Sequence, residues 1–279
     1  MKYFPWASMV MFVSGASILF WHYLEARGLQ LRPSVHYETV AHIPLPAGYK
    51  RISLEAGSFG AWLRKIPLKT DNTVYLYNGL VKPNQSAQFA VLDISVGKKD
   101  LQQCADAVIR LYAEYLYASQ QFGRIAFHAT DGTLMEYNSW MSGYRFLVKD
   151  GRLRKQRTAT VCQGRDCFNQ FLQTVFSYAG TLSLSKELST VASAGSIRVG
   201  DVFIRGGSPG HAVLVMDMAE NAAGQKVFLL AQSYMPAQDI HILKSPGNSF
   251  FPWYHVASID KLVVTPEWVF KTEELMRFR

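Results

Sequence analysis

Three residues in the second half of the sequence have the types that nucleophilic catalysis needs: Cys167, His211 and Gln232. Cys167 follows Asp166 at the start of a predicted helix, where free N–H groups and the helix dipole favour a thiolate. A neutral histidine can take the thiol proton, and a third polar group can hold the imidazole ring in place. We therefore predict Cys167 as the nucleophile, His211 as the base and Gln232 as the group that orients it.

Each of the three residues also has a structural interpretation. Cys167 can be a small buried residue, or it can form a disulfide with Cys162; we expect no disulfide, because it would consume the thiol. His211 follows a Pro-Gly pair and precedes Ala-Val-Leu-Val, so it can be a packed histidine at the start of a buried strand. Gln232 ends an apolar strand, and a polar residue there favours a site over a core.

Polar and aromatic residues near these positions are candidates for ligand contacts. Ser233 and Tyr234 directly follow Gln232, and Trp253 lies in a later aromatic segment. We expect these side chains to contact a ligand in a cleft over the candidate catalytic residues.

Other residues with reactive side chains are predicted to be structural. Cys104 lies on the apolar stripe of a predicted helix, so we interpret it as a core residue, although the nearby Asp106 could face a site. His241 alternates with two isoleucines and is expected on the outer face of a strand. No histidines have metal-ligand spacing on a helix, and the glycine-rich segment 206–210 lacks the lysine of a phosphate-binding loop. We therefore predict no metal and no cofactor.

The elements that must position these residues are amphipathic helices and a run of strands. Apolar residues recur every three or four positions in 101–117 and in 168–178, which predicts a helix in each segment. Strands are predicted at 73–77, 88–96, 199–205, 210–217, 226–232 and 240–243, with a closing helix at 267–278. Helices followed by consecutive strands indicate an α+β fold.

The N-terminal segment 4–23 contains no charged residue and is long enough to cross the ~30 Å hydrocarbon core of a bilayer. Tryptophan and tyrosine lie near its ends, where membrane-spanning helices carry aromatic residues. We interpret it as an uncleaved signal anchor; the alternatives are a cleaved signal peptide and a buried helix. A lysine before the segment favours an inner-membrane protein with its body exported to the periplasmic side, and a cleaved, secreted form is the alternative.

The composition excludes several classes of protein. The 279 residues are 49% hydrophobic and 18% charged, which excludes disorder, and three cysteines are too few for a disulfide scaffold. The net charge of +8 permits an anionic partner, but no nucleic-acid-binding motif is present and we predict no nucleic acid partner. We divide the chain into an anchor or signal segment, a linker, an N-terminal α/β part and a C-terminal part, at 1–24, 25–46, 47–158 and 159–279.

The order of motifs in the C-terminal part resembles one known class of enzyme. An Asp-Cys opens a helix, Gly200-Asp201 precedes a strand, Gly210-His211 starts the next, and a polar residue ends a third. This order resembles the papain-like cysteine hydrolases of the NlpC/P60 and CHAP kind. The resemblance implies that 159–279 form a papain-like helix packed on an antiparallel sheet.

Longer stretches resemble a second family. They are Leu101–Leu111, Val175–Leu184, Gly200–Ile204, Pro209–Val213 and Leu230–Leu243. Over roughly 45–260 the chain resembles the uncharacterised bacterial family called domain of unknown function 4846. That resemblance implies no activity.

Two functions follow from these observations. The first is a membrane-anchored cysteine hydrolase or transferase for peptide or amide bonds in the cell envelope, with cell-wall peptide as a partner. The second is an inactive module of the same fold that binds an envelope ligand through His211, Gln232 and Tyr234. The distance between Cys167 and His211 distinguishes them, because proton transfer needs the two side chains within ~4 Å.

Overall fold

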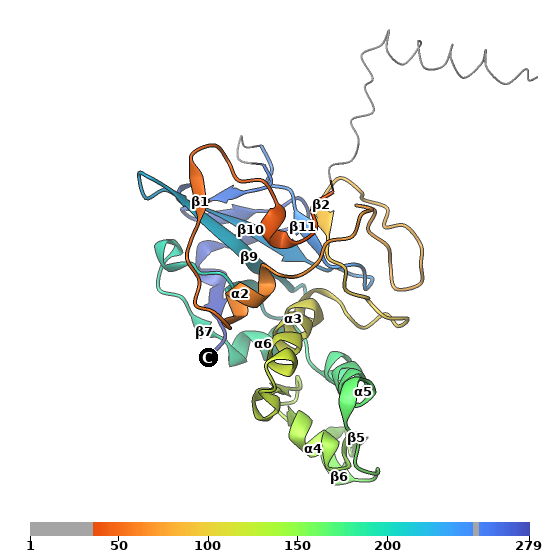
Figure 1. Cartoon of the computed structure of the whole chain (residues 1–279). Coiled ribbons are helices and arrows are strands. Elements are labelled where there is room, and N and C mark those ends of the chain that lie inside the picture. Colours follow the sequence, from red (N-terminus) through yellow and green to blue (C-terminus); the bar gives the residue numbers. More distant parts are fainter. Residues whose placement is uncertain (1–35, 248–250) are drawn as a thin grey trace, which may run out of the picture. The chain divides into compact units, whose positions relative to one another are not determined.

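The computed structural model describes residues 36–247 and 251–279, and residues 37–279 form one compact unit (Figure 1). The predicted anchor at 4–23 lies outside the described residues. Within the described ranges, no helix has the length and apolar character needed to cross a membrane.

The main element of this unit is an antiparallel sheet of nine strands in the order β2-β11-β10-β9-β8-β15-β7, with β1 beside β9 and β12 beside β10. Its strands are β1 (Tyr49–Arg51), β2 (Gln88–Val91), β7 (Ser189–Thr190), β8 (Val202–Arg205), β9 (His211–Asn221), β10 (Lys226–Gln232), β11 (His241–Leu243), β12 (Tyr254–His255) and β15 (Leu275–Arg277). The long central strands β9 and β10 cross the middle of the sheet in Figure 1.

The central strands β9 and β10 are apolar along most of their length because both faces of the sheet are covered. Side chains alternate between faces along a strand, so Ala212 and Leu214 enter one hydrophobic core while Val213 and Val215 enter another. The continuous apolar runs read from the sequence therefore belong to buried antiparallel strands.

The first face is covered by α3 (Cys104–Ala118), which packs against β9, together with α2 (Phe59–Leu63). Small and aliphatic side chains such as Ala105 and Val108 line the inner side of α3, and they let the helix lie close to the strand. The side chain of Asp106 accepts the backbone N–H of Gln103 at 3.1 Å, which fixes the start of the helix.

The second face is covered by the hairpin β13 (Leu262–Val264) and β14 (Val269–Lys271). Val263 and Phe270 point into the second core. The helix predicted at 267–278 is therefore wrong: this segment alternates between buried and exposed positions, and it forms β14 and β15 around a short turn.

The remaining elements lie between α3 and the sheet strand β8 in sequence. They are β3 (Ala126–His128), β4 (Leu134–Glu136), α4 (Tyr137–Met141), β5 (Tyr144–Lys149), β6 (Arg152–Arg157), α5 (Gly164–Tyr178) and α6 (Thr181–Glu187). The described residues also contain five short 3-10 helices: η1 (Val40–His42), η2 (Phe122–Arg124), η3 (Ala194–Ser196), η4 (Val256–Ser258) and η5 (Thr272–Glu274).

The predicted fold class is wrong. The described residues form a mostly antiparallel sheet with few helices, and the sheet takes β1 and β2 from before residue 158. The helix on β9 is α3, whereas α5, expected there, packs on α4 (Figure 1). The physical reason is the buried side of α5, which is aromatic: Phe171 meets the rings of Tyr137 and Trp140 at 5.4 and 5.9 Å.

Candidate functional site

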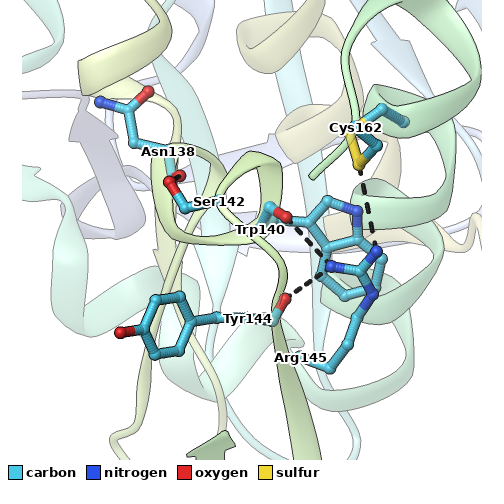
Figure 2. The surroundings of a disulfide bond; sticks show 7 residues. Asn138, Trp140, Ser142, Tyr144, Arg145 and Cys162 are labelled. Atoms are coloured by element: carbon cyan, nitrogen blue, oxygen red, sulfur yellow. Dashed lines mark hydrogen bonds between the residues drawn. A yellow bond between two sulfur atoms is a disulfide. The ribbon is translucent and has the colours of Figure 1, made fainter. Parts of the chain in front are cut away.

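Cys167 is joined to Cys162 by a disulfide, so the expectation that the two would stay unpaired is wrong. The bond forms because the chain leaving β6 turns directly into α5 and brings the two side chains together. Around it, the guanidinium of Arg145 lies 4.0 Å over the Trp140 ring, and one of its nitrogens is 4.0 Å from the Cys162 sulfur (Figure 2). A disulfide-bonded sulfur offers no thiolate, and Cys167 is not a nucleophile in this form.

The other two predicted residues meet. His211 opens β9 and Gln232 ends β10, and because these neighbours are antiparallel, the start of one lies beside the end of the other. His211 Nε2 lies 2.9 Å from Gln232 Oε1, and both residues are 1% exposed. Gln232 therefore holds the imidazole ring by one nitrogen.

A hydrogen-bonded relay of Glu267, Lys82 and Asn84 fixes the direction of the Gln232 amide. Its Nε2 donates to Glu267 Oε2 at 2.7 Å, and Glu267 also accepts from Lys82 at 2.6 Å and from Asn84 at 2.9 Å. With the amide nitrogen turned to Glu267, the amide oxygen faces His211 and accepts from its Nε2–H. Among the described residues, His211 Nδ1 has no hydrogen-bond partner, and in this tautomer it carries the basic lone pair.

His241 belongs to the same polar cluster. The residue is fully buried, so its expected place on an outer strand face is wrong; β11 lies between β2 and β10, where both faces are covered. Its Nδ1 lies 2.8 Å from the carbonyl oxygen of Asp239, and its Nε2 lies 3.4 Å from the Gln232 amide nitrogen.

The environment keeps both imidazoles neutral. Burial lowers the pKa of His211 to about 4, against smaller opposing effects of the Gln232 hydrogen bond and the Glu267 charge. Burial likewise lowers the pKa of His241 to about 4. Although burial by itself raises the pKa of Glu267, Lys82 and Asn84 hold it below its usual value. A neutral His211 near pH 7 can accept a proton.

Cys104 is buried, as the sequence predicted, and it opens the helix that packs against β9. It is the first residue of α3, it is a free thiol, and it is 6% exposed. Burial raises the pKa of its thiol to about 11, while the backbone amides of Ala105 and Ala212 act to lower it. Ala212 directly follows His211, so the sulfur faces the start of β9.

A cavity of about 270 Å³ opens beside this thiol. Its wall includes Cys104 and Asp106 of α3, Thr181 of α6 and the loop 207–210 that leads into His211. A cysteine at a helix start beside the Gly-His strand is thus found at Cys104, although His211 itself does not line this cavity.

The family model for domain of unknown function (4846) matches residues 40–277. The chain belongs to this family. The predicted resemblance to the 4846 family is confirmed, whereas no comparison supports the resemblance to papain-like hydrolases. No curated protein and no solved structure matches the chain.

Of the three residues predicted to contact a ligand in this 4846-family protein, one lies beside His211 and two do not. The rings of Tyr234 and Trp268 lie 4.8 and 5.2 Å from that of His211, so Tyr234 lies at the site and Trp268 is an aromatic neighbour that the sequence did not suggest. Ser233 is fully buried, and its single hydroxyl proton is shared between two backbone carbonyls, that of Gln238 at 2.8 Å and that of Gln102, just before α3, at 3.1 Å. Ser233 thus ties the helix start to the strand end rather than contacting a ligand.

Trp253 lies elsewhere. Its indole N–H donates to the carbonyl of Pro44 at 2.7 Å, and the strand that follows it, β12, pairs with the first half of β10, away from Gln232. Trp253 is fully buried in the first core and does not line a cleft over His211. Within residues 36–247 and 251–279, no cluster of three His, Cys, Asp or Glu side chains could hold a metal ion.

Proposed function

We propose that the protein is a cysteine hydrolase or transferase for peptide or amide bonds, with Cys104 as nucleophile, His211 as base and Gln232 as the residue that positions the base. The observation that carries this proposal is the hydrogen bond between His211 Nε2 and Gln232 Oε1. It directs the basic Nδ1 away from Gln232. The next residue, Ala212, is near enough to the Cys104 thiol for its backbone amide to lower the pKa of that thiol, against the larger effect of burial.

The reaction requires two steps. In the first, His211 Nδ1 takes the thiol proton, the Cys104 sulfur adds to the amide carbonyl carbon, and the leaving amine departs with that proton, which gives a thioester. In the second, His211 takes a proton from water, or from an acceptor amine, as it attacks the thioester. The acyl group then leaves as acid or as new amide, and the thiol is restored.

The start of α3 supports the charge that develops in both steps. The first N–H groups of a helix have no partner within the helix, and they bear the positive end of its dipole. Beside Cys104 they can stabilise the carbonyl oxygen as it becomes negative. At rest both side chains are neutral, because the pKa of the Cys104 thiol is about 11 and that of the His211 imidazole is about 4. The thiol proton must therefore move to His211 during the attack rather than before it.

The direct test uses iodoacetamide on the unreduced full-length protein at pH 7.5, with peptide mass spectrometry to locate the label. We expect label on Cys104 alone, and a rate at least about tenfold lower in His211→Ala. The matched control is His255→Ala, which changes a partly exposed histidine on β12. If Cys104 reacts at the same rate in wild type and His211→Ala, the two side chains are not coupled and the proposal fails.

A binding module is the second candidate function, because the raised pKa of Cys104 leaves the thiol protonated and poorly nucleophilic at rest. In that case Tyr234 and His211 would contact a ligand without turnover. Cys104→Ser separates the two: a binding module keeps its ligand affinity and its function, whereas a hydrolase loses turnover and keeps binding.

We also propose that the body acts outside the cytoplasm, in the cell envelope, with cell-wall peptide as substrate. The support is the Cys162–Cys167 disulfide, since such bonds persist in oxidising compartments and are rare in the cytosol. Thiol counting on protein isolated with alkylating agent present tests this: one free thiol supports export, and three free thiols contradict it.

A further inference from the structure

Two neighbouring cavities form one groove between the loop 93–99 and the helices α3 and α5. The first cavity has a volume of about 180 Å³ and the second has a volume of about 390 Å³. Arg110 and Asn169 line both of them, so the two cavities adjoin. Neither Cys104 nor His211 lines this groove, so what the groove binds does not depend on the proposed function.

The wall of the first cavity is basic. It contains Lys98, Lys99 and Arg110, and it contains no carboxyl group. Lys98 is exposed and makes no ion pair with any residue that the structure describes. The Lys99 ammonium reaches from the loop to α5, where it donates to Gln173 Oε1 at 3.0 Å, and that partner is neutral. Both lysine charges are therefore uncompensated within the cavity, and an anion bound there is attracted by each of them.

The guanidinium of Arg110 is held in place with one nitrogen unused. Its Nε donates to Glu114 Oε1 at 2.8 Å, and its Nη1 donates to Gln102 Oε1 at 3.0 Å. Its Nη2 has no hydrogen-bond partner among the described residues and is not fully enclosed. Because the Arg110 side chain is 19% exposed and lines both cavities, this nitrogen is available to a ligand in the groove. A fixed guanidinium loses little freedom when it binds an oxyanion.

The carboxylate of Glu114 does not neutralise the groove. One of its oxygens accepts from Arg110 and the other accepts from Arg165 of α5, so a single negative charge is shared by two positive ones. The only other acid in the walls of the two cavities is Asp93. Against these two acidic side chains stand five basic ones, a surplus of three positive charges: Lys65, Lys98, Lys99, Arg110 and Arg165.

The second cavity is more apolar. Its wall includes the side chains of Trp62, Ile66 and Ile94 beside the charged groups. Ligand pockets commonly combine apolar walls with a few polar groups that fix orientation. A ligand that matches the whole groove therefore has an anionic group at one end and a small organic part at the other.

We propose that the groove binds a small soluble phosphate monoester. The phosphate lies in the first cavity against Lys98, Lys99 and Arg110 Nη2, and the organic part lies in the second cavity beside Trp62. A phosphate monoester carries a charge of about −1.5 to −2 near pH 7 and three strong acceptor oxygens, which serve three cationic donors better than a carboxylate does. Cavities of about 180 and 390 Å³ suit a small molecule rather than a polymer.

The test is isothermal titration calorimetry on the full-length protein with four probes. Glucose 1-phosphate, glucuronate and glucose share a hexose ring and differ in charge, and inorganic phosphate lacks the organic part. We expect glucose 1-phosphate to bind at least about tenfold more tightly than glucuronate, and glucose to bind most weakly, because charge-assisted hydrogen bonds supply the affinity. Inorganic phosphate should bind as well and should compete with glucose 1-phosphate.

Two variants assign the binding to the groove. Lys98→Glu changes an exposed residue, so the fold is retained, and it should weaken the binding of glucose 1-phosphate at least about tenfold by placing a negative charge beside the phosphate. Arg110→Lys keeps the positive charge but loses the planar guanidinium, and it should weaken binding about tenfold. The matched control is Lys186→Glu, an equal change of charge at an exposed lysine of α6 that lines neither cavity.

Four outcomes would overturn the proposal. The first is the absence of saturable binding for both inorganic phosphate and glucose 1-phosphate. The second is glucuronate binding as tightly as glucose 1-phosphate, which would remove the preference for phosphate. The third is an equal loss of affinity in Lys98→Glu and Lys186→Glu, which would mean a general attraction by the net charge. The fourth is binding to phosphatidylcholine vesicles that contain phosphatidate without binding of the soluble ester, which would make a lipid the source of the phosphate.

Discussion

Helices α3 and α5 are both fifteen residues long and both carry a cysteine in their first turn, yet their cysteines differ in chemistry. Cys104 is a free thiol beside the start of β9, where His211 and its relay are located. Cys167 is oxidised, on a helix that packs against α4 and not against the sheet. A helix start becomes a candidate site only where the neighbouring element provides a base.

The side chains on the buried faces decide which helix reaches the sheet. The inner side of α3 is small and aliphatic, with Ala105, Val108 and Ala113 in the core, and it packs against β9. The inner side of α5 is bulky, and Phe168 lies 4.4 Å from the ring of Tyr117 at the end of α3. A cysteine alone cannot distinguish these environments; the residues one turn further along the helix can.

The largest expected effect tests the difference between Cys104 on α3 and Cys167 on α5. Cys104→Ala should lower the turnover of an amide substrate by roughly a thousandfold or more, because the nucleophile is lost. The double variant Cys162→Ala/Cys167→Ala should keep turnover within about threefold of wild type, since the disulfide that it removes lies at the start of a different helix, α5. Steady-state rates on both variants, with folding checked by circular dichroism, are the measurement. The assignment is wrong if the double variant loses turnover and Cys104→Ala keeps it.

Acid should destabilise the protein through the buried histidines of β9 and β11, His211 and His241. Burial depresses the pKa of His241 from its ordinary value of 6.5 to about 4, so an unfolded chain binds more protons in that range. The stabilisation is complete above about pH 6.5 and is lost as the pH falls toward 4, by on the order of 2 to 3 kcal/mol.

Urea unfolding of wild type and His241→Asn at pH 7 and pH 4.5 measures this contribution. The raised pKa of Asp106 acts in the opposite direction, so only the difference between two proteins that share Asp106 is informative. An equal loss of stability in both proteins between the two pH values would contradict a depressed pKa for His241.

The α5 region should respond to reductant instead. Opening the disulfide frees a loop with a sequence separation of five residues, which corresponds to about 2 kcal/mol in the chain-entropy treatment. Thermal unfolding with and without reductant should therefore shift in wild type and stay unchanged in Cys162→Ala/Cys167→Ala. A reductant effect of the same size in the double variant would mean that it acts through another part of the molecule.

The smallest expected effect tests whether Glu267 positions His211 through Gln232. Glu267→Gln should lower kcat about tenfold with little change in KM, because the Gln232 amide loses the charge that sets its direction and His211 loses its fixed tautomer. Glu273→Gln, at an exposed position in the same segment, is the control. A fall in KM alone, or an equal loss in the control, would show that Glu267 does not position His211.

The sequence predicted the strands of the site better than its helix. The runs at 210–217 and 226–232 became β9 and β10, because continuous apolar segments between turns are typical of buried strands. His211 and Gln232 were found for the same reason, as polar residues at the ends of such runs. Their mutual contact follows from antiparallel pairing, which the sequence permits without specifying.

The helix that carries Cys104 was predicted to start three residues too early, whereas the burial of Cys104 was predicted correctly. A helix that begins at Leu101 places Cys104 one turn inside, in the core; the observed helix begins at Cys104, with Gln103 as N-cap. The signal that marks this start is Asp106, three positions after the cap, whose side chain accepts the Gln103 N–H. The relay lay beyond sequence reasoning, because Lys82 and Glu267 are 185 positions apart and join only in the folded chain.

That separation has a consequence for the order of events in synthesis. The last group of the relay, Glu267, belongs to the loop between β13 and β14, whereas Cys104 and Lys82 emerge from the ribosome far earlier. A nascent chain therefore carries its thiol through most of translation without a positioned base. Contacts of such long range also form late in folding, after the entropy of closing the loop has been overcome. In the proposed function, the reactive state is therefore withheld until the whole described chain has been made and folded.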